Sequence, residues 1–383
     1  MWVIDMECPR CHNQNINYLY QHNNQYYCRK CIQFHKVDIH QKRLTKKLTF
    51  SNVFVSYTLD FNLSPKQKEI SHSLVECFKN KQNAYVWAVC GSGKTEIVFE
   101  VIRYALNTGH RVCFCVPRKE LVRELYERMK VAFSNVEIGL LYGGTIENIE
   151  SPFIVCTMHQ LYRFENDVGF DLMIADEIDA FPFYQNEVLE SIFHQCCLGS
   201  FVKMSATIEE SDIKDGQIFI LNRRYHGYDL PVPRLMLLPQ LTYKLVLLFL
   251  MKTNQAQYII YVPTIHKVQE IVSFLNQYHI LCAGVSSKSS GNQEKIAMLR
   301  EGCIQALVST TLLERGITIE NVQVIVLWGN HRVFHWKTLV QIAGRVGRKP
   351  NHPTGHIYIL SPERTKDIQK CISIIKKLNR MSV

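Results

Sequence analysis

The chain has 383 residues, of which 47% are hydrophobic and 20% are charged. This length is typical of two domains with a small addition, and this composition excludes an intrinsically disordered chain. Basic and acidic residues number 8 and 3 in residues 1–50, 17 and 24 in 51–232, and 19 and 7 in 233–383, which gives net charges of +5, −7 and +12. We therefore expect three modules, and the two basic ones suit a polyanionic partner unless their charge serves only solubility.

The most apolar run of the sequence is too short to cross a membrane. It extends from Leu245 to Met251 with a lysine on each side, far less than the roughly 18 residues that a membrane helix needs. Asp5 and Glu7 interrupt the apolar core that a signal peptide requires. Ten of the 14 cysteines lie scattered in apolar runs, which indicates buried free thiols in a reducing compartment. We therefore expect a cytoplasmic protein without a transmembrane segment.

The other four cysteines form two CxxC pairs, Cys8 with Cys11 and Cys28 with Cys31, separated by 16 residues. This spacing predicts a structural Zn²⁺ site, because each pair brings two sulfurs to one cation and four thiolates complete a tetrahedron. A module of about 50 residues buries little core, so the metal would stabilise its fold. A redox pair is the alternative, but thioredoxin-type CxxC motifs occur singly within a βαβ pattern.

Aromatic and basic residues surround these cysteines, namely Tyr18, Tyr20, Tyr26, Tyr27, Arg10, Arg29, Lys30, Lys42, Arg43, Lys46 and Lys47. Interleaved in this way, they would stack on bases and bind phosphates. A small tyrosine-rich core with a solvated basic tail explains the same pattern equally well. The sequence leaves both explanations open.

From Phe61 onward, short apolar runs alternate with helical patterns. We predict strands at residues 85–90, 112–116, 153–157, 172–175 and 201–204, and helices at 66–79, 95–106 and 118–132. This alternation is typical of an α/β fold with a doubly wound, mostly parallel sheet. In such sheets, ligands bind at the carboxyl ends of the strands.

The first predicted strand is followed by a phosphate-binding loop that begins with Ala rather than the usual Gly, Ala88-Val-Cys-Gly91-Ser92-Gly93-Lys94-Thr95. Its glycines allow backbone N–H groups to surround a β-phosphate at the start of a helix. Lys94 would reach the β- and γ-phosphates, and the Thr95 hydroxyl would bind Mg²⁺. The loop predicts a nucleotide site.

A second motif begins 82 residues after Lys94, where the apolar run 172–175 leads into Asp176-Glu177-Ile178-Asp179. A fully apolar strand is typical of the buried centre of a sheet. Asp176 at its carboxyl end would bind Mg²⁺, and Glu177 would orient or deprotonate the attacking water. The two motifs together predict a nucleotide hydrolase, and no GxGxxG follows the first strand, as a Rossmann oxidoreductase would require.

With these motifs, the sequence resembles the two-lobed RecA-like motors of helicase superfamily two, whose first motif AxxGxGKT matches residues 88–95. The resemblance extends to an adenine-recognising Gln67 in residues 63–67 and to a coupling motif, Ser205-Ala206-Thr207. Residues 176–179 look like the DEAD-type box of this superfamily. The resemblance also implies contacts with a nucleic-acid strand at three positions of this lobe, Arg118, Gly144 and Thr157.

The second lobe continues the resemblance, with predicted strands at 258–262, 281–285, 306–309, 324–327 and 356–360. Thr264 lies in a segment similar to the fourth helicase motif and Thr310 in one similar to the fifth, so both are expected strand contacts. Gln341, Arg345 and Arg348 belong to a QxxGRxGR segment similar to the sixth motif and are expected catalytic groups. Guanidinium is always charged and matches phosphate oxygens, which suits stabilisation of phosphoryl transfer.

Within superfamily two, the sequence resembles the ComFA family of late competence proteins. Residues 176–182 resemble the family's DEVDAFP, residues 224–233 its RYHGxxLPVP, and residues 310–316 its TTxLERG, and a four-cysteine module precedes the motor in both. Ile208 is a departure, because Pro commonly follows Ser-Ala-Thr. The resemblance implies ATP, Mg²⁺ and structural Zn²⁺ as cofactors and single-stranded DNA and other competence proteins as partners. It also implies action at the inner face of the cell membrane, and it leaves the oligomeric state open.

The sequence therefore predicts a zinc-binding module at residues 1–50 and RecA-like lobes at 51–232 and 233–383. Together they would form an ATP-driven motor that draws single-stranded DNA into the cytosol by gripping the strand alternately. The first alternative is a PriA-like replication-restart helicase, in which the zinc region is inserted in the second lobe. The others are a DEAD-box RNA helicase, whose Q motif residues 63–67 do not match, and a zinc-dependent nucleic-acid-binding protein with an inactive motor.

Overall fold

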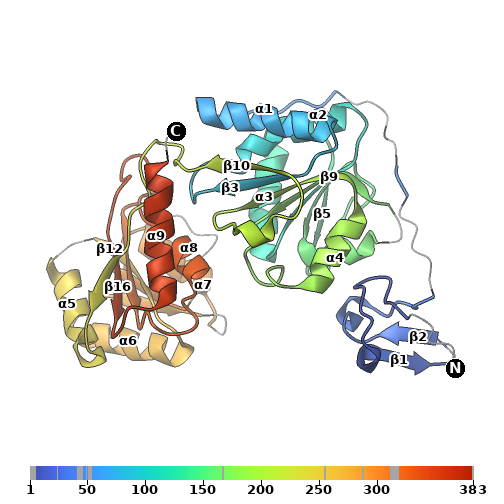
Figure 1. Cartoon of the computed structure of the whole chain (residues 1–383). Coiled ribbons are helices and arrows are strands. Elements are labelled where there is room, and N and C mark those ends of the chain that lie inside the picture. Colours follow the sequence, from blue (N-terminus) through green and yellow to red (C-terminus); the bar gives the residue numbers. More distant parts are fainter. Residues whose placement is uncertain are drawn as a thin grey trace. The chain divides into compact units, whose positions relative to one another are not determined.

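The computed structural model describes residues 6–23, 25–40, 46–48, 50, 54–165, 168–253, 256–286, 289–310 and 319–381. The chain forms two compact units (Figure 1). The first comprises Met1–Trp87 and Lys94–Ile220, and the second comprises Ala88–Gly93 and Leu221–Val383. The domain boundaries that the sequence suggests at 50/51 and 232/233 stay predictions.

The N-terminal part of the first unit is a small module around the two CxxC pairs. Its described elements are η1 (Ile16–Tyr18), β1 (Leu19–His22), β2 (Gln25–Cys28) and η2 (Ile32–Phe34). The strands pair antiparallel, with Leu19 opposite Cys28. Cys28 therefore ends a strand, while Cys11 lies in a turn that directly follows Cys8.

The main part of the first unit is a sheet that has eight strands among the described residues. They are β3 (Ala84–Ala88), β4 (Val112–Val116), β5 (Ile138–Tyr142), β6 (Thr145–Glu147), β7 (Phe153–Thr157), β8 (Phe170–Asp176), β9 (Cys197–Ser205) and β10 (Gln217–Leu221). Their order is β10-β3-β9-β8-β4-β7-β5-β6, and the pairs from β3 to β5 are parallel. β4, β7 and β8 are buried throughout, which explains their apolar sequences. The five predicted strands are confirmed, and β5, β6 and β10 are additional.

Helices flank this sheet (Figure 1). Their bounds are α1 (Pro65–Lys79), η3 (Glu96–Val98), α2 (Phe99–Asn107), α3 (Lys119–Ala132), η4 (Met158–Arg163), α4 (Glu187–Cys196) and η5 (Glu210–Asp212). α1 starts with Pro at its first turn and with a capping box between Ser64 and Gln67. The helix predicted at 95–106 differs at its start, because the chain leaves the phosphate-binding loop through the 3₁₀ turn η3 before α2 begins.

The second unit has a sheet with six strands among its described residues, in the order β11-β16-β15-β12-β14-β13. The strands are β11 (Arg234–Leu237), β12 (Gln257–Tyr261), β13 (Cys282–Val285), β14 (Ala306–Ser309), β15 (Val322–Leu327) and β16 (Ile357–Ser361), all paired parallel. The helical segments are η6 (Gln240–Thr242), α5 (Tyr243–Thr253), α6 (Ile265–Gln277), α7 (Asn292–Arg300), α8 (Trp336–Ala343) and α9 (Lys366–Arg380). The predicted parallel α/β sheet is confirmed in both units.

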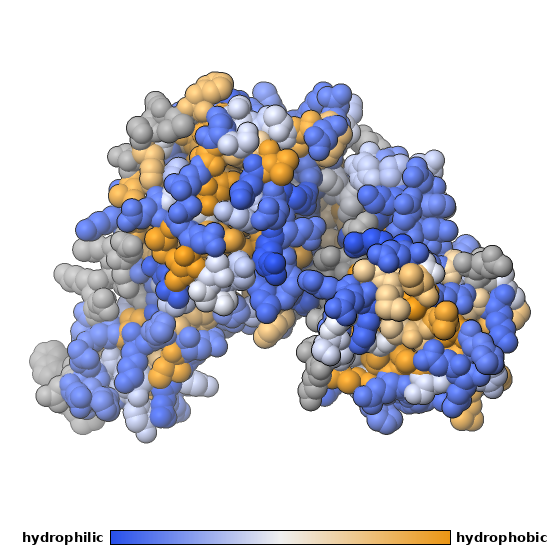
Figure 2. Space-filling view, turned by 180° about the vertical axis from the view of Figure 1, so that it is seen from behind, coloured by the Kyte–Doolittle hydropathy of each residue, from blue (hydrophilic) through white to orange (hydrophobic). Residues whose placement is uncertain are grey.

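On the face shown in Figure 2, hydrophilic residues surround several groups of apolar ones. In the second unit, Leu241, Leu245 and Phe249 of η6 and α5 are largely exposed. None of the described helices has both the length and the apolar character to span a bilayer. The expectation of buried free thiols is wrong for Cys303, which is exposed because it lies in the turn after α7.

Candidate functional site

The phosphate-binding loop connects β3 to η3 and has the backbone conformation that its glycines allow. Gly91 and Gly93 have φ angles of +81° and +75°, in the left-handed region that residues with a Cβ avoid. Two such turns within three residues let successive N–H groups point toward one anion. The loop therefore has the backbone that the sequence motif requires for binding a phosphate.

Lys94 at the end of this loop lies beside the acidic pair after β8. Its Nζ is 2.7 Å from Asp176 Oδ1 and 3.5 Å from Glu177 Oε1. Burial raises the pKa of the Asp176 carboxyl, and the Lys94 ammonium acts in the opposite direction by stabilising its charged form. The fold thus brings together three predicted residues that are 82 and 83 positions apart.

The backbone of Glu177 and the hydroxyl group of Thr95 are further parts of the site around Lys94. Glu177 has a φ of +56°, and its backbone N–H donates to Asp176 Oδ1 over 2.7 Å, which orients the Asp176 carboxylate. The Thr95 side chain, next to Lys94, is buried. A hydroxyl and a carboxylate are oxygen ligands that Mg²⁺ prefers, so Thr95 and Asp176 fit the predicted cation.

The acidic box also contacts the predicted coupling motif. Thr207 donates a hydrogen bond from Oγ1 to Asp179 Oδ2, and both residues are buried. The Thr207 N–H donates to Ser205 Oγ over 3.0 Å, so the Ser-Ala-Thr turn is internally braced. Trp87 of β3 donates from Nε1 to the Ala206 carbonyl. The acidic box is therefore hydrogen-bonded to the turn at the end of β9, and this turn is hydrogen-bonded to β3.

Gln67, the predicted adenine ligand, is buried at the start of α1. Its Oε1 accepts a hydrogen bond from the Ser64 N–H over 2.7 Å, and its own N–H donates to Ser64 Oγ. The carboxamide oxygen thus already serves the helix cap. This structural role of Gln67 was not predicted from the sequence. The signal was present, because Ser at the N-cap followed three residues later by Gln is a capping-box pattern.

Gln341 and Arg345 of the second unit are buried, and Arg348 is partly buried. Arg348 donates from Nε to the Gly344 carbonyl over 3.0 Å. A buried residue outside the predicted set, Arg224, donates from Nη1 to the Gly347 carbonyl over 2.5 Å and from Nη2 to Gly344 over 3.4 Å. Burial lowers the pKa of Arg224 to about 10. The only sequence signal for Arg224 is its place in the family-like segment 224–233.

The predicted strand contacts lie where parallel strands end. Arg118 follows β4, Gly144 follows β5 and Thr157 ends β7, so all three are at one edge of the first sheet. Thr264 follows β12 and Thr310 follows β14, at the equivalent edge of the second sheet. This edge is where ligands bind in doubly wound sheets. Residues 311–316 of the fifth-motif segment lie outside the described residues, as do Lys42 and Arg43.

The four predicted zinc ligands converge. Cys8 Sγ is 3.7 Å from Cys31 Sγ, Cys11 Sγ is 3.7 Å from Cys28 Sγ, and all four sulfurs lie within 4.8 Å of one another. A tetrahedron with Zn–S bonds of about 2.3 Å has S–S edges of about 3.8 Å, so the cluster fits Zn²⁺. The four buried thiols leave no open position for a substrate, which suits a structural metal.

The sequence left open whether the tyrosines near the cysteines form a small core or stack on bases, and the structure answers this in part. Tyr18 and Tyr20 are exposed, so these two do not form a core. The Arg29 guanidinium lies 3.7 Å from the ring centre of Tyr20. Arg10, in contrast, is buried and therefore cannot hold phosphates as the sequence suggested; its contacts are described below.

Comparison with protein families assigns both units. The model described as type III restriction enzyme, res subunit, matches residues 60–210, and that described as helicase conserved C-terminal domain matches residues 239–350. The chain is 31% identical to competence protein ComFA of Bacillus subtilis (strain 168), over 98% of this chain and 86% of that protein. It is 30% identical to competence protein ComFA of Streptococcus pneumoniae (strain ATCC BAA-255 / R6), over 97% and 90% of the two chains.

More distant relatives share the motor. The ATP-dependent DNA helicase RecG of Staphylococcus epidermidis is 24% identical over 82% of this chain and 50% of that protein. Among solved structures, Saccharomyces cerevisiae Dbp5 bound to RNA and ADP BeF3 superimposes with a TM-score of 0.56 at 16% identity, covering 83% of this chain and 92% of that one. The structural likeness shows the fold alone. Together with the family matches, it makes the two units a helicase-like, ATP-hydrolysing pair of RecA-like lobes.

Proposed function

Because the chain belongs to the ComFA family of competence proteins, we propose that it is an ATP-driven motor that moves single-stranded DNA into the cytoplasm during natural transformation. The observation that supports this most directly is the contact of Lys94 with Asp176 and Glu177. It places the lysine of a phosphate-binding loop beside the acidic pair that serves the cation and the water in nucleotide hydrolases.

The proposed roles at the nucleotide follow from these positions. Residues 91–95 would hold the phosphates, with Thr95 and Asp176 binding Mg²⁺, which supplies charge neutralisation on the β- and γ-oxygens. Glu177 would accept the proton of the attacking water. Gln67 would recognise adenine, and Gln341, Arg345 and Arg348 are the proposed catalytic groups of the second unit. These arginines would stabilise the charge of the phosphoryl group in transfer.

The proposed nucleic-acid contacts are the loops at the carboxyl ends of the strands, at Arg118, Gly144, Thr157, Thr264 and Thr310. Such loops would contact the phosphate backbone of the DNA, so we expect binding that is independent of the base sequence and weakens as the salt concentration rises. Other competence proteins are the proposed partners, at the inner face of the cell membrane, and Zn²⁺ is the proposed metal of Cys8, Cys11, Cys28 and Cys31. A PriA-like helicase is the weaker alternative, because the cysteines here precede both lobes.

ATP turnover with and without single-stranded DNA tests the proposal. We expect the oligonucleotide to raise the rate of the full chain several-fold, because strand binding completes the site. Lys94→Ala should lower turnover by about 10²-fold or more, since it removes a charge that contacts the transferred phosphoryl group. Lys79→Ala, which removes an exposed lysine paired with Glu76, is the matched control and should retain the full rate. Equal rates with and without DNA would contradict the motor.

A further inference from the structure

The N-terminal module packs on the segment that directly follows Thr157, one of the proposed DNA contacts. Its cysteines and Phe34 belong to the same buried cluster as Met158 and Leu161 of η4. The Phe34 ring, almost fully buried, stacks on His159 with ring centres 5.8 Å apart and an interplanar angle of 29°. The core of the module is therefore continuous with the core of the first unit rather than separate from it.

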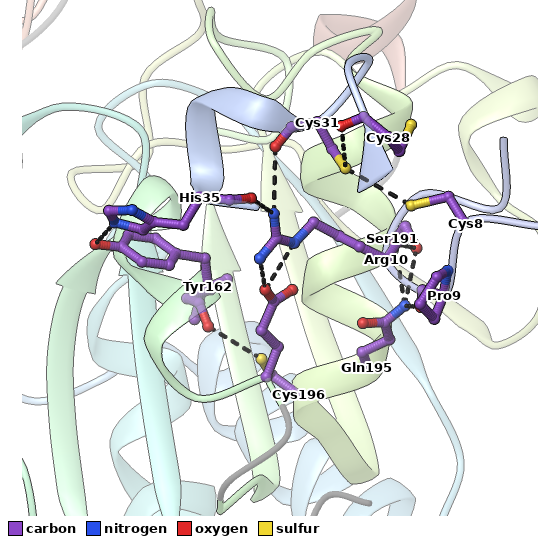
Figure 3. Close-up of polar contacts among 12 residues, drawn as sticks. Cys8, Pro9, Arg10, Cys28, Cys31, His35, Tyr162, Ser191, Gln195 and Cys196 are labelled. Atoms are coloured by element: carbon purple, nitrogen blue, oxygen red, sulfur yellow. Dashed lines mark hydrogen bonds and ion pairs between the residues drawn. The ribbon is translucent and has the colours of Figure 1, made fainter. Parts of the chain in front are cut away.

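Arg10, between the cysteines of the first CxxC pair, joins three parts of the structure through one buried guanidinium (Figure 3). Its Nε donates to Glu165 Oε1 over 2.6 Å, and its Nη2 donates to the same oxygen. Its Nη1 donates to the Cys31 carbonyl over 3.2 Å and to the His35 carbonyl over 2.6 Å. The side chains of Arg10 and Glu165 are 4% and 3% exposed. Because water is excluded from both groups, the guanidinium and the carboxylate stabilise each other's charge.

Helix α4 holds the other side of the first CxxC loop, as Figure 3 also shows. Ser191 Oγ and Gln195 Nε2 both donate to the Arg10 carbonyl, and Gln195 Nε2 also donates to Pro9 over 2.9 Å. The Cys196 thiol at the end of α4 donates to the Leu161 carbonyl of η4 over 3.3 Å. The module thus contacts η4 both directly and through α4.

We propose that the four-cysteine module is a clamp that fixes η4, and with it the strand-contacting loop at Thr157, through the Arg10–Glu165 ion pair and the Phe34–His159 stack. Arg10 and Glu165 are positioning residues, since neither belongs to the proposed nucleotide or DNA contacts. The inference rests on the proposed function because it takes Thr157 as a DNA contact. It assigns to the module a role in shaping the DNA site of the first unit rather than gripping the strand itself.

A metal bound by the four cysteines would affect the clamp through the residues to which Arg10 is hydrogen-bonded. Arg10 belongs to the first CxxC pair, while its acceptors Cys31 and His35 belong to and follow the second. A cation that joins the two pairs would help to keep these groups at a fixed separation, because the described elements of the module are only two short strands and two 3₁₀ turns. Metal loss would therefore release the Arg10 acceptors and leave Glu165 buried with a weakened partner.

The test uses the full chain with Arg10→Met and Glu165→Gln, and hydrogen exchange of a peptide spanning residues 158–165 as the main readout. We expect both variants to keep one zinc per chain and wild-type affinity for a fluorescent ATP analogue. Exchange over 158–165 should accelerate by about tenfold or more, and the affinity for labelled oligo(dT) should fall by about tenfold. Removal of zinc from the wild type by a chelator should produce the same acceleration.

Arg29→Met is the matched control, because it removes the same charge from the second CxxC pair at an exposed side chain that lies over Tyr20. It should leave the exchange over 158–165 unchanged. An equal loss of oligo(dT) affinity in Arg29→Met and Arg10→Met would show that the module grips DNA by its charge and would overturn the clamp. Unchanged exchange in Arg10→Met and Glu165→Gln would overturn it as well.

Glu165→Gln leaves every residue of the module intact, so it decides the question if Arg10→Met does not fold. The exchange measurement contains no DNA. A wild-type chain that does not bind oligo(dT) would therefore refute the proposed function, while the exchange over 158–165 would still confirm or overturn the clamp.

Discussion

The Lys94 ammonium is the counter-charge of a buried carboxylate in this structure, and a bound nucleotide would change its partner. Asp176 has a raised pKa because of burial, and Lys94 is the nearest cation that stabilises its charged form. With Lys94 on a phosphate, the Asp176 carboxylate would be available to bind Mg²⁺. The same two side chains therefore suit both the nucleotide-free and the nucleotide-bound site.

Asp176→Asn should distinguish the contact of Asp176 with Lys94 from its proposed role as a Mg²⁺ ligand. Without the carboxylate, Mg²⁺ should no longer raise the affinity for ATP, and turnover should fall by about 10²-fold or more. Affinity for ATP in EDTA should be retained, because Lys94 loses a competing partner. Titration of a fluorescent ATP analogue with and without Mg²⁺ measures this. A variant that still gains affinity from Mg²⁺ would show that the cation is held elsewhere.

Arg224 orders the segment that contains the proposed catalytic arginines. It bonds the Gly344 and Gly347 carbonyls, and Arg348 bonds Gly344 as well. We expect Arg224→Met to lower kcat for ATP by about 10-fold with little change in KM, because loss of the two bonds loosens groups used in the transition state. Arg223→Met, which removes the neighbouring guanidinium paired with Asp229, should change neither constant. A similar loss in both variants would contradict the assignment.

A further ion pair, between a buried lysine of β9 and a partly buried glutamate of α4, joins two elements of the first unit. Lys203, itself buried, donates to Glu190, and the rings of Phe183, Phe193 and Phe201 surround its ammonium. Burial acts to raise the pKa of Glu190, but bonds from His194 and Lys203 outweigh it and lower that pKa to about 2. Ser191 and Gln195 of α4 contact Arg10, so the pair that holds α4 against β9 also helps to hold the N-terminal module in place.

The pKa of Glu190 gives a sign for the pH dependence of stability. Because the pKa is lowered in the folded chain, the pair stabilises it above about pH 4.5, and this stabilisation is lost as pH falls toward about 2. Glu190→Gln should cost about 1–3 kcal/mol at pH 7, and the difference from wild type should shrink below about pH 4.5. Urea unfolding from pH 7 down to about pH 3 measures this. Glu120→Gln, on the exposed face of α3, should show no such trend.

At the scale of the molecule, the four cysteines of the module belong to a core cluster of the first unit. The cluster that contains Cys8, Cys11, Cys28 and Cys31 continues into η4, β8 and α4, whereas the second unit has its own cluster around β12 and β15. A metal that stabilises the module should therefore stabilise the first unit as well, by an amount that depends on metal affinity.

Calorimetry with and without a zinc chelator tests this coupling. We expect the chelator to lower the melting temperature of one transition by about 5–15 °C and to leave the other unchanged. Cys8→Ser, which already lacks one ligand, should show little further shift on chelation. Two transitions that shift equally would indicate that the metal stabilises both units, and no shift would indicate that it stabilises neither.

Much of the fold followed from local patterns. Runs such as 112–116 and 306–309 are apolar because both faces of a parallel strand are covered, so β4 and β14 appear in the structure with the predicted bounds. The short β6 was not predicted, since its residues are half-exposed or exposed and lack an apolar run. The proximity of Lys94 to Asp176 and Glu177 was also predictable, because loops after parallel strands meet at one edge of the sheet.

Contacts between distant positions could not be obtained in this way. Arg10 and Glu165 are 155 residues apart, and each alone looks like a solvated surface charge. Arg224 looks equally ordinary until the fold places it against Gly347, 123 residues later. Periodicity and motifs report which face of an element is buried and which chemistry a loop contains. The pairing of a buried charge depends instead on which loops the chain topology brings together, and on burial that removes water as the competing partner.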